Sequence, residues 1–132
     1  MNTENFTEEL YNHPLSGKVI GCAIEVHRQL GPGLLESAYQ RCLAHELSLK
    51  GLAFSVEHPI PVTYKGINID CGFRIDLWIE NFLVVELKAV DHISNIHQAQ
   101  LLTYMKLIEA PIGLILNFNT ERLKDGIKKL VI

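Results

Sequence analysis

The sequence predicts an α/β fold in which a three-stranded meander is extended by a parallel fourth strand, with helices covering the sheet. Apolar and polar residues alternate along two neighbouring runs, 74–79 and 83–88, which is the pattern of a half-buried hairpin. The continuously apolar run 112–118 follows a helical segment and is typical of a buried parallel strand, reached by a right-handed crossover. The expected core order is therefore α-β-β-β-α-β.

Length and composition predict a polar leader at 1–16 followed by a single domain at 17–132. The chain has 132 residues, 48% of them hydrophobic and 20% charged, as in a globular protein with a real core. A net charge of −3 excludes a global basic field for nucleic acid, so contact with nucleic acid would need a local patch or a partner subunit. No apolar run is long enough to cross a bilayer, so no membrane association is expected.

The three cysteines are an odd number and have no CxxC spacing. This usage favours buried free thiols in the reducing cytoplasm over a disulfide framework or a zinc site.

The N-terminal third predicts two helices that pack side by side. The leader carries at most a helical turn at 8–11, ended by Pro14. Ser16 is a candidate N-cap for a helix that reaches Leu30 and is stopped by the following Gly-Pro-Gly. A second helix is expected from about 34 to 50, with Gly51 as its C-terminal cap. Its expected buried stripe is Leu35, Tyr39, Cys42, Leu43 and Leu47.

The remaining segments predict the sheet and one more helix. Strands are expected at 52–64 and 67–79, and Pro59 and Pro61 favour an edge position for the first, since proline cannot donate to the ladder. The third strand is 83–88. A helix then begins after the candidate N-cap Ser94 and ends near 109, with Leu101, Leu102, Met105 and Ile108 inward. The parallel strand and a short last strand at 127–132 follow.

The parity of the apolar residues sets the hairpin register. Ile75, Leu77 and Ile79 can face the same core as the odd-numbered residues of 83–88 only if odd residues pair with odd residues, which a loop at 80–82 allows. Asp76 then lies opposite Glu86. Cβ atoms paired in this way are roughly 4.5–5.5 Å apart, and directly opposed like charges destabilise a sheet. A cation between the two carboxylates would remove that cost.

Asp76, Glu86 and Lys88 therefore form the first candidate site. Two carboxylates on adjacent strands suit a hard divalent cation such as Mg²⁺ or Mn²⁺. Lys88, two residues further on the same face, can hold or deprotonate a water molecule or neutralise charge that develops on a phosphate. The alternative is a surface ion cluster in which Lys88 only pairs with Glu86, which is common and weakly stabilising.

Two helical pairs are further candidates. Gln100 and Tyr104 are four residues apart and share one helix face, so Gln100 can point towards the metal region and Tyr104 towards substrate. An ordinary amphipathic helix with a polar shoulder explains the same pair. Glu36 can point at the sheet beside Asp76, with Tyr39 on the same side of the helix. A carboxylate in a first helical turn also complements the helix dipole without any function.

These motifs occur in an order that resembles the small GxxExxY family, which is grouped with the PD-(D/E)XK nuclease superfamily. The resemblance covers about 17–118 and rests on Gly33-x-x-Glu36-x-x-Tyr39, Ala23-Ile24-Glu25-Val26-His27 and Val85-Glu86-Leu87-Lys88-Ala89-Val90. It implies a restriction-endonuclease-like core.

Residue by residue, the resemblance implies that Asp76 is the strand-two aspartate and that Glu86 and Lys88 are the E-x-K pair. It makes Glu36 the acid of the first core helix. Gln100-x-x-x-Tyr104 is similar to the Q-x-x-x-Y motif of RecB-like members. The chain departs from many nucleases at 74–75, where Arg-Ile stands in place of a proline, a position that shapes the backbone and binds no metal.

The resemblance implies a Mg²⁺- or Mn²⁺-dependent phosphodiesterase acting on nucleic acid, with DNA preferred to RNA. Asp76 and Glu86 bind the metal, Lys88 helps to activate water, and Glu36 and Gln100 support the site; Tyr104 and Tyr39 are assigned to substrate. The alternative is a catalytically silent module that binds nucleic acid or protein on the same fold. A third hypothesis, a small-molecule or purely structural role in a larger complex, has no positive signal in the sequence. A homodimer formed through the helices would widen the concave surface of so short a chain.

Overall fold

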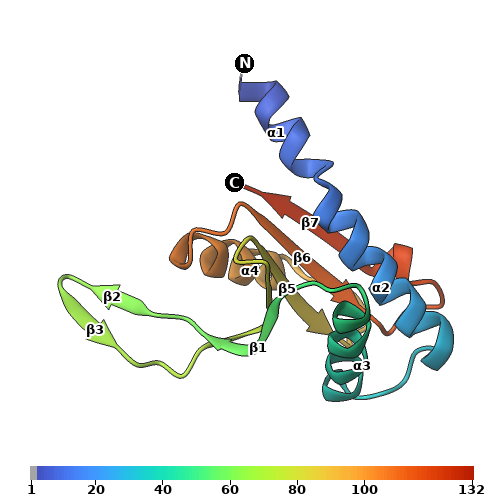
Figure 1. Ribbon diagram of the computed structural model, residues 1–132. Coiled ribbons are helices and arrows are strands. Elements are labelled where there is room, and N and C mark those ends of the chain that lie inside the picture. Colours follow the sequence, from blue (N-terminus) through green and yellow to red (C-terminus); the bar gives the residue numbers. More distant parts are fainter. Residues whose placement is uncertain (1–2) are drawn as a thin grey trace.

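The computed structural model describes residues 3–132, with side chains from Thr7 onward, and is built on a five-stranded sheet covered on both faces by helices (Figure 1). The strand order is β1-β4-β5-β6-β7. Only the β5–β6 pair is parallel; the other neighbours are antiparallel. The strands are β1 (Phe54–Pro59), β4 (Arg74–Ile79), β5 (Leu83–Lys88), β6 (Ile112–Asn117) and β7 (Ile127–Val131).

The sheet separates the apolar residues into two cores, one on each face, and helices cover both. One core packs α2 and α3 against Leu77, Val85 and Leu114, and the other packs α4 against Val84 and Ile115. A short 3-10 helix, η1 (Leu123–Gly126), leads from β6 into β7. The α-helices are α1 (Thr3–Tyr11), α2 (Pro14–Leu30), α3 (Glu36–Leu49) and α4 (Asn95–Leu107).

The structure confirms the predicted α/β class and core order. The strands β1, β4 and β5 form the antiparallel meander, and β6 adds in parallel after the α4 crossover. Ser94 caps α4: its Oγ accepts the His97 N–H, and the His97 ring accepts the Ser94 N–H. The predicted C-terminal tail pairs with β6 as the other edge strand.

The start of the chain is more ordered than the sequence pattern suggested. Residues 3–11 form a complete helix, α1, whose Tyr11 carbonyl accepts a hydrogen bond from Lys129 Nζ of β7 (2.7 Å). Pro14 opens α2 instead of ending the preceding helix, because proline lacks an N–H and that position needs none. The N-cap is His13, whose Nδ1 accepts the Leu15 N–H, so the prediction of Ser16 was wrong.

The two long strands expected at 52–64 and 67–79 are each broken in the middle. Their outer parts form a separate hairpin, β2 (Val62–Tyr64) and β3 (Ile67–Ile69), which extends away from the body as an arm (Figure 1). Pro61 has no N–H to continue the ladder, and Gly72 has a φ of +70° on the other side of the arm. β1 is nevertheless an edge strand, as its prolines indicated.

Three residues depart from the burial that was predicted for them: two are exposed, and one is buried in the other core. Leu35 is 78% exposed, because α3 begins one residue later and Leu35 stays extended. The Cys71 thiol is exposed, whereas Cys22 is buried. Ile75 is buried, but in the α4 core rather than in the α2–α3 core that contains Leu77. The alternation of β4 is therefore interrupted between Ile75 and Leu77.

Gly113 of β6 allows α4 to lie directly on the sheet. A Cβ at this position would stand 2.5 Å from Met105 Sδ and 2.9 Å from Leu101 Cδ1. We therefore expect Gly113→Ala to lower the free energy of unfolding by about 1–3 kcal/mol through overpacking. Gly21→Ala is the matched control, because its Cβ meets nothing within 4 Å and alanine favours the α2 helix by about 1 kcal/mol. Urea denaturation of both variants checks this, and equal stability would contradict it.

Candidate functional site

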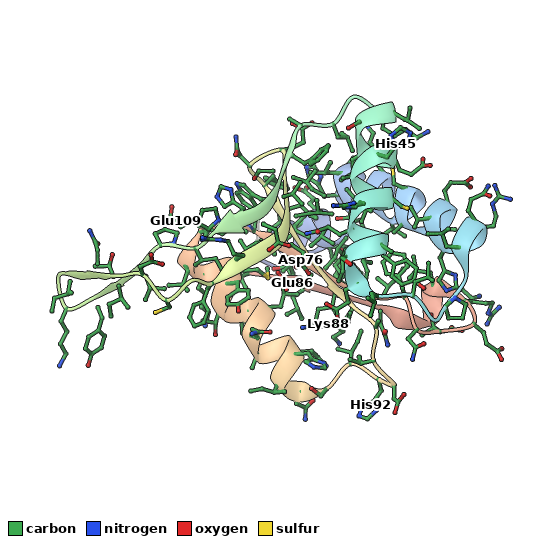
Figure 2. All side chains as sticks on the ribbon, turned by 90° about the horizontal axis from the view of Figure 1, so that it is seen from below. His45, Asp76, Glu86, Lys88, His92 and Glu109 are labelled. Carbon is green, nitrogen blue, oxygen red and sulfur yellow. The ribbon has the colours of Figure 1, made fainter. Side chains whose placement is uncertain are left out.

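The candidate site lies where the β4–β5 ladder ends. The two strands pair as Ile79–Leu83, Trp78–Val84 and Leu77–Val85 around the loop at 80–82, in the predicted register. Continuing that register brings Asp76 opposite Glu86, but this position is no longer a backbone pair. Figure 2 shows both carboxylates close together, with Lys88 nearby, in the space between α3 and α4.

At the open end of the ladder, each carboxylate holds a backbone amide of the opposite strand. The Asp76 N–H donates to Glu86 Oε1 (3.2 Å), and the Leu87 N–H donates to Asp76 Oδ2 (2.7 Å). The second oxygens, Asp76 Oδ1 and Glu86 Oε2, have no hydrogen-bond partner among the described residues. Neither oxygen is fully buried: among the described residues, the only fully buried side-chain polar atom without a hydrogen-bond partner is Ser16 Oγ. One free oxygen of each carboxylate therefore remains open to a ligand.

Burial and like charge make the ionised pair unfavourable. Glu86 is only 7% exposed, and burial, reinforced by the charge of Asp76, raises its pKa to about 8. Burial also raises the pKa of Asp76, with Glu57 and Glu36 adding to the rise and the Leu87 N–H and Lys88 opposing it. A bound cation would favour both charged forms.

Lys88 places a positive charge near the two carboxylates but forms no direct ion pair with either of them in the described structure. Its side chain is half-buried, and no ion pair joins it to Asp76 or Glu86 within the side chains that the structure describes. A surface ion cluster is therefore not what the structure contains. The end of β5 is held by backbone and amide bonds: Phe118 N–H donates to the Lys88 carbonyl, and the buried Asn117 carboxamide bonds both polar backbone atoms of Val90.

Tyr104 of α4 interacts electrostatically with the same carboxylates, and Gln100 contacts Tyr104. Gln100 Nε2 donates to the Tyr104 hydroxyl (2.9 Å), as their spacing of four residues allows. Burial raises the pKa of the Tyr104 hydroxyl, and the charges of Glu86 and Asp76 add to the rise, which places that hydroxyl within electrostatic reach of the pair. The α4 pair therefore borders the site.

The two residues from the helix at 36–49 have different positions. Glu36, exposed in the first turn of α3, is close enough for its charge to act on Asp76. Tyr39 is fully buried and stacks on Phe118 with ring centroids 4.3 Å apart. Its hydroxyl donates to the Gly31 carbonyl (2.6 Å) and accepts the Leu34 N–H (3.1 Å). Tyr39 therefore stabilises the loop that leads into α3. Because its ring is buried and its hydroxyl is used by that loop, Tyr39 does not have the position expected of a residue that contacts substrate.

Two residues beside the pair were missed by the sequence reasoning. Glu57 of β1 occupies the register position next to Asp76, and its charge adds to the rise in the pKa of Asp76. Gln40 of α3 bonds both Glu57 and the backbone of Asp76. Gln40 is four residues after Glu36, and this spacing was the one signal in the sequence that could have pointed to it.

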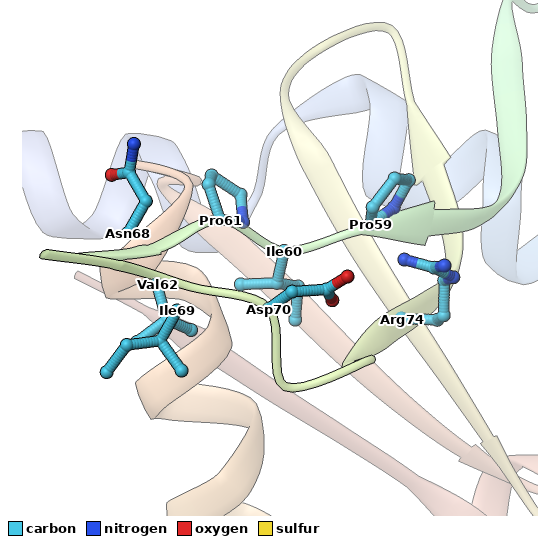
Figure 3. A pocket seen from close by; sticks show the side chains of 8 residues that line it. All are labelled: Pro59, Ile60, Pro61, Val62, Asn68, Ile69, Asp70 and Arg74. Carbon is cyan, nitrogen blue, oxygen red and sulfur yellow. The ribbon is translucent and has the colours of Figure 1, made fainter.

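A separate hollow of 590 Å³ lies at the base of the β2–β3 arm (Figure 3). Its lining residues do not include the paired carboxylates; they are 59–62, Asn68, Ile69, Asp70 and Arg74. The hollow is therefore a different feature from the candidate site. No helix within residues 3–132 is both long and apolar enough to cross a membrane.

The two carboxylates fit a divalent cation whose remaining ligands are water molecules and the substrate. In the described part of the chain, no three His, Cys, Asp or Glu side chains are grouped so that they could hold a metal ion by themselves. Mg²⁺ does not require such a cage, since one or two carboxylates, several waters and substrate phosphates are its usual ligands. The free oxygens of Asp76 and Glu86 meet that requirement.

This meander, with a parallel fourth strand and a D…E-x-K constellation at its open end, defines a protein with a restriction-endonuclease-like fold. The family model of the PD-(D/E)XK nuclease superfamily matches residues 13–130. The chain therefore belongs to the PD-(D/E)XK nuclease superfamily, whose nucleases typically use divalent metals. Searches of curated proteins and of solved structures gave no match.

Proposed function

We propose that this protein is a divalent-metal-dependent nuclease that hydrolyses phosphodiester bonds, with DNA preferred to RNA. The supporting observation is the buried carboxylate pair, in which each member accepts an opposite-strand amide with one oxygen, while the other oxygen has no hydrogen-bond partner in the described part of the chain. The superfamily membership points to nucleic acid as the substrate.

We assign the residues the following roles. Asp76 and Glu86 would hold Mg²⁺ or Mn²⁺, an ion that supplies a Lewis acid for the phosphate and lowers the pKa of a bound water. Lys88 provides an ammonium group that has no carboxylate partner among the described side chains, and this group can orient a water molecule or balance the charge of the phosphate. Gln100 would orient the Tyr104 hydroxyl through their hydrogen bond, and Tyr104 would contact the substrate.

We also assign the chain to the GxxExxY group, because the spacing has a physical explanation here. Gly33 has a φ of +101°, a conformation that L side chains rarely adopt. Tyr39 bonds the carbonyl of Gly31 and the amide of Leu34, on either side of Gly33. Glu36 is thereby presented at the start of α3, near Asp76. The motif would therefore position one acidic side chain at the metal site.

The proposal is tested by nicking of supercoiled DNA, and by cleavage of a matched RNA, in the presence of Mn²⁺ or of EDTA. We expect wild-type protein to nick DNA only with Mn²⁺. Lys88→Met should lower the rate about a hundredfold or more while it leaves Mn²⁺ binding in calorimetry within a few fold, because lysine acts on water or phosphate and not as a ligand. Lys106→Met is the control, since Lys106 lies in the last turn of α4 and its side chain is exposed.

The competing hypothesis, a silent binding module, predicts a different result. Wild-type protein and the variants would then share the same background of nicking, and no Mn²⁺ would bind at Asp76 and Glu86. The net charge of −3 favours this hypothesis, because it gives the chain no global attraction for nucleic acid. Light scattering tests the expected homodimer independently of cleavage.

A further inference from the structure

The carboxamide of Gln40 joins three elements of the site with a single nitrogen. Gln40 Nε2 donates to Glu57 Oε1 of β1 (2.7 Å) and to the Asp76 carbonyl of β4 (3.0 Å). Both N–H groups of that nitrogen are therefore used, one on each strand. Because Gln40 belongs to α3, its side chain links this helix directly to the backbone of a proposed metal ligand.

The position that Gln40 bonds is the one gap in the β1–β4 ladder. The strands pair at Val56–Leu77 and again at His58–Ile75, but Glu57 and Asp76 between them do not pair. Glu57 has a φ of +52°, in the left-handed region that disfavours residues other than glycine. Strained backbone of this kind persists where the surroundings hold it, and it is concentrated at functional sites.

Asp76 lacks a backbone pair on both sides, because the β1–β4 ladder has its gap there and the β4–β5 ladder ends at Leu77–Val85. Towards β5, its amide bonds the Glu86 side chain instead of a backbone carbonyl. Towards β1, its carbonyl bonds Gln40 instead of a backbone amide. Asp76 is therefore positioned by side chains, and Gln40 is the one that comes from outside the sheet.

We propose that Gln40 is a positioning residue that fixes Asp76 for the metal site and sets Glu36 beside it. Gln40 and Glu36 are four residues apart on one face of α3, so tethering Gln40 to β4 also fixes the first turn, which carries Glu36. Glu57 is the anchor that orients the Gln40 carboxamide. The inference rests on the proposed function for its catalytic consequence, but the tether itself can be tested without metal.

Gln40→Met tests the tether, since methionine has a similar length and no hydrogen-bond donor. Amide hydrogen exchange is measured on the metal-free protein by NMR. We expect the Asp76 and Leu87 amides, which bond the two carboxylates, to exchange about fivefold to tenfold faster, a change of the size that one hydrogen bond supports. The amides of Leu43 and Leu47 should keep their wild-type rates, because a tether at the carboxylates does not hold the rest of α3.

Gln98→Met is the matched control, because Gln98 is also half-buried on a helix and none of the described contacts uses its carboxamide. Wild-type exchange at Asp76 and Leu87 in Gln40→Met would overturn the proposal. A uniform increase along α3 would also overturn it, since Gln40 would then only anchor the helix.

Two Glu57 variants separate the anchor from its charge. Glu57→Gln keeps an acceptor oxygen for Gln40 and should leave the two exchange rates near wild type, whereas Glu57→Ala should raise them as Gln40→Met does. If the two variants behave alike, the anchoring role of Glu57 is refuted.

Calorimetry with Mn²⁺ alone then tests whether the Gln40 tether affects metal binding. Weaker binding to Gln40→Met by about fivefold to tenfold supports the positioning role, and unchanged binding overturns it. If wild-type protein binds no Mn²⁺, the proposed function fails, while the exchange rates still decide whether Gln40 positions Asp76.

Discussion

Asp76→Asn is expected to abolish Mn²⁺ binding and to lower the nicking rate at least about a thousandfold, which corresponds to ~4 kcal/mol of transition-state stabilisation. The single carbonyl oxygen of asparagine can still accept the Leu87 N–H that Asp76 Oδ2 now accepts. The amide nitrogen then replaces the free oxygen and cannot bind a cation. The variant should therefore stay folded and lose the site.

Calorimetry with Mn²⁺ and the supercoiled DNA assay measure these two effects. Asp70→Asn is the matched control, because Asp70 is an exposed aspartate whose Oδ1 also accepts a backbone amide, that of Gly72. This control should bind Mn²⁺ and nick DNA as the wild type does. Nicking by Asp76→Asn within tenfold of wild type would refute the assignment of Asp76 as a ligand.

The metal-free protein is expected to lose stability as the pH rises from 5 to 8. The pKa of Glu86 is about 8 in the folded protein, compared with 4.5 for an ordinary glutamate. The folded state therefore binds more protons than the unfolded state throughout this window, and the free energy of unfolding falls as the pH increases. At 1.36 kcal/mol for each pKa unit, the decrease is on the order of 3 kcal/mol.

Urea denaturation in EDTA at pH 5 and at pH 8 measures the slope. Glu86→Gln should remove most of the slope and be the more stable protein at pH 8, because the amide never ionises. Glu121→Gln, a change at an exposed glutamate, should keep the wild-type slope. A wild-type slope in Glu86→Gln would show that Glu86 does not titrate in this range.

Adding Mn²⁺ at pH 8 should restore stability to the wild-type protein. An ion that binds only the folded state stabilises it, by about 2.7 kcal/mol at a hundredfold excess over the dissociation constant. Glu86→Gln should gain little, since it lacks one ligand. This difference separates metal binding from the titration of Glu86 alone.

The hairpin of Asp76 and Glu86 shows what period-two patterns can predict. The odd-with-odd pairing and the loop at 80–82 are present, because a shift of one residue would expose the apolar face of both strands. The Gln100–Tyr104 contact followed from helical spacing in the same way. Both predictions used interactions that are local or that bury a continuous face.

The errors fell where contacts between distant segments outweigh the local pattern. Tyr39 has the spacing of a site residue, but its hydroxyl is used by the loop before α3. Ile75 has the parity of Leu77, yet it packs under α4 because β4 changes its pattern at Asp76. The strands at 52–64 and 67–79 read as continuous, although their outer parts leave the sheet as an arm.

The sequence by itself determined the order of the elements, the register of the central hairpin and the D…E-x-K constellation, because the period of apolar residues decides which side chains must share a face. Only the tertiary structure decided how the carboxylates are held: Gln40 reaches Glu57 and Asp76 from a helix 17 and 36 residues away in the chain. Such contacts depend on how α3 docks on the sheet, and no local propensity or spacing encodes that distance.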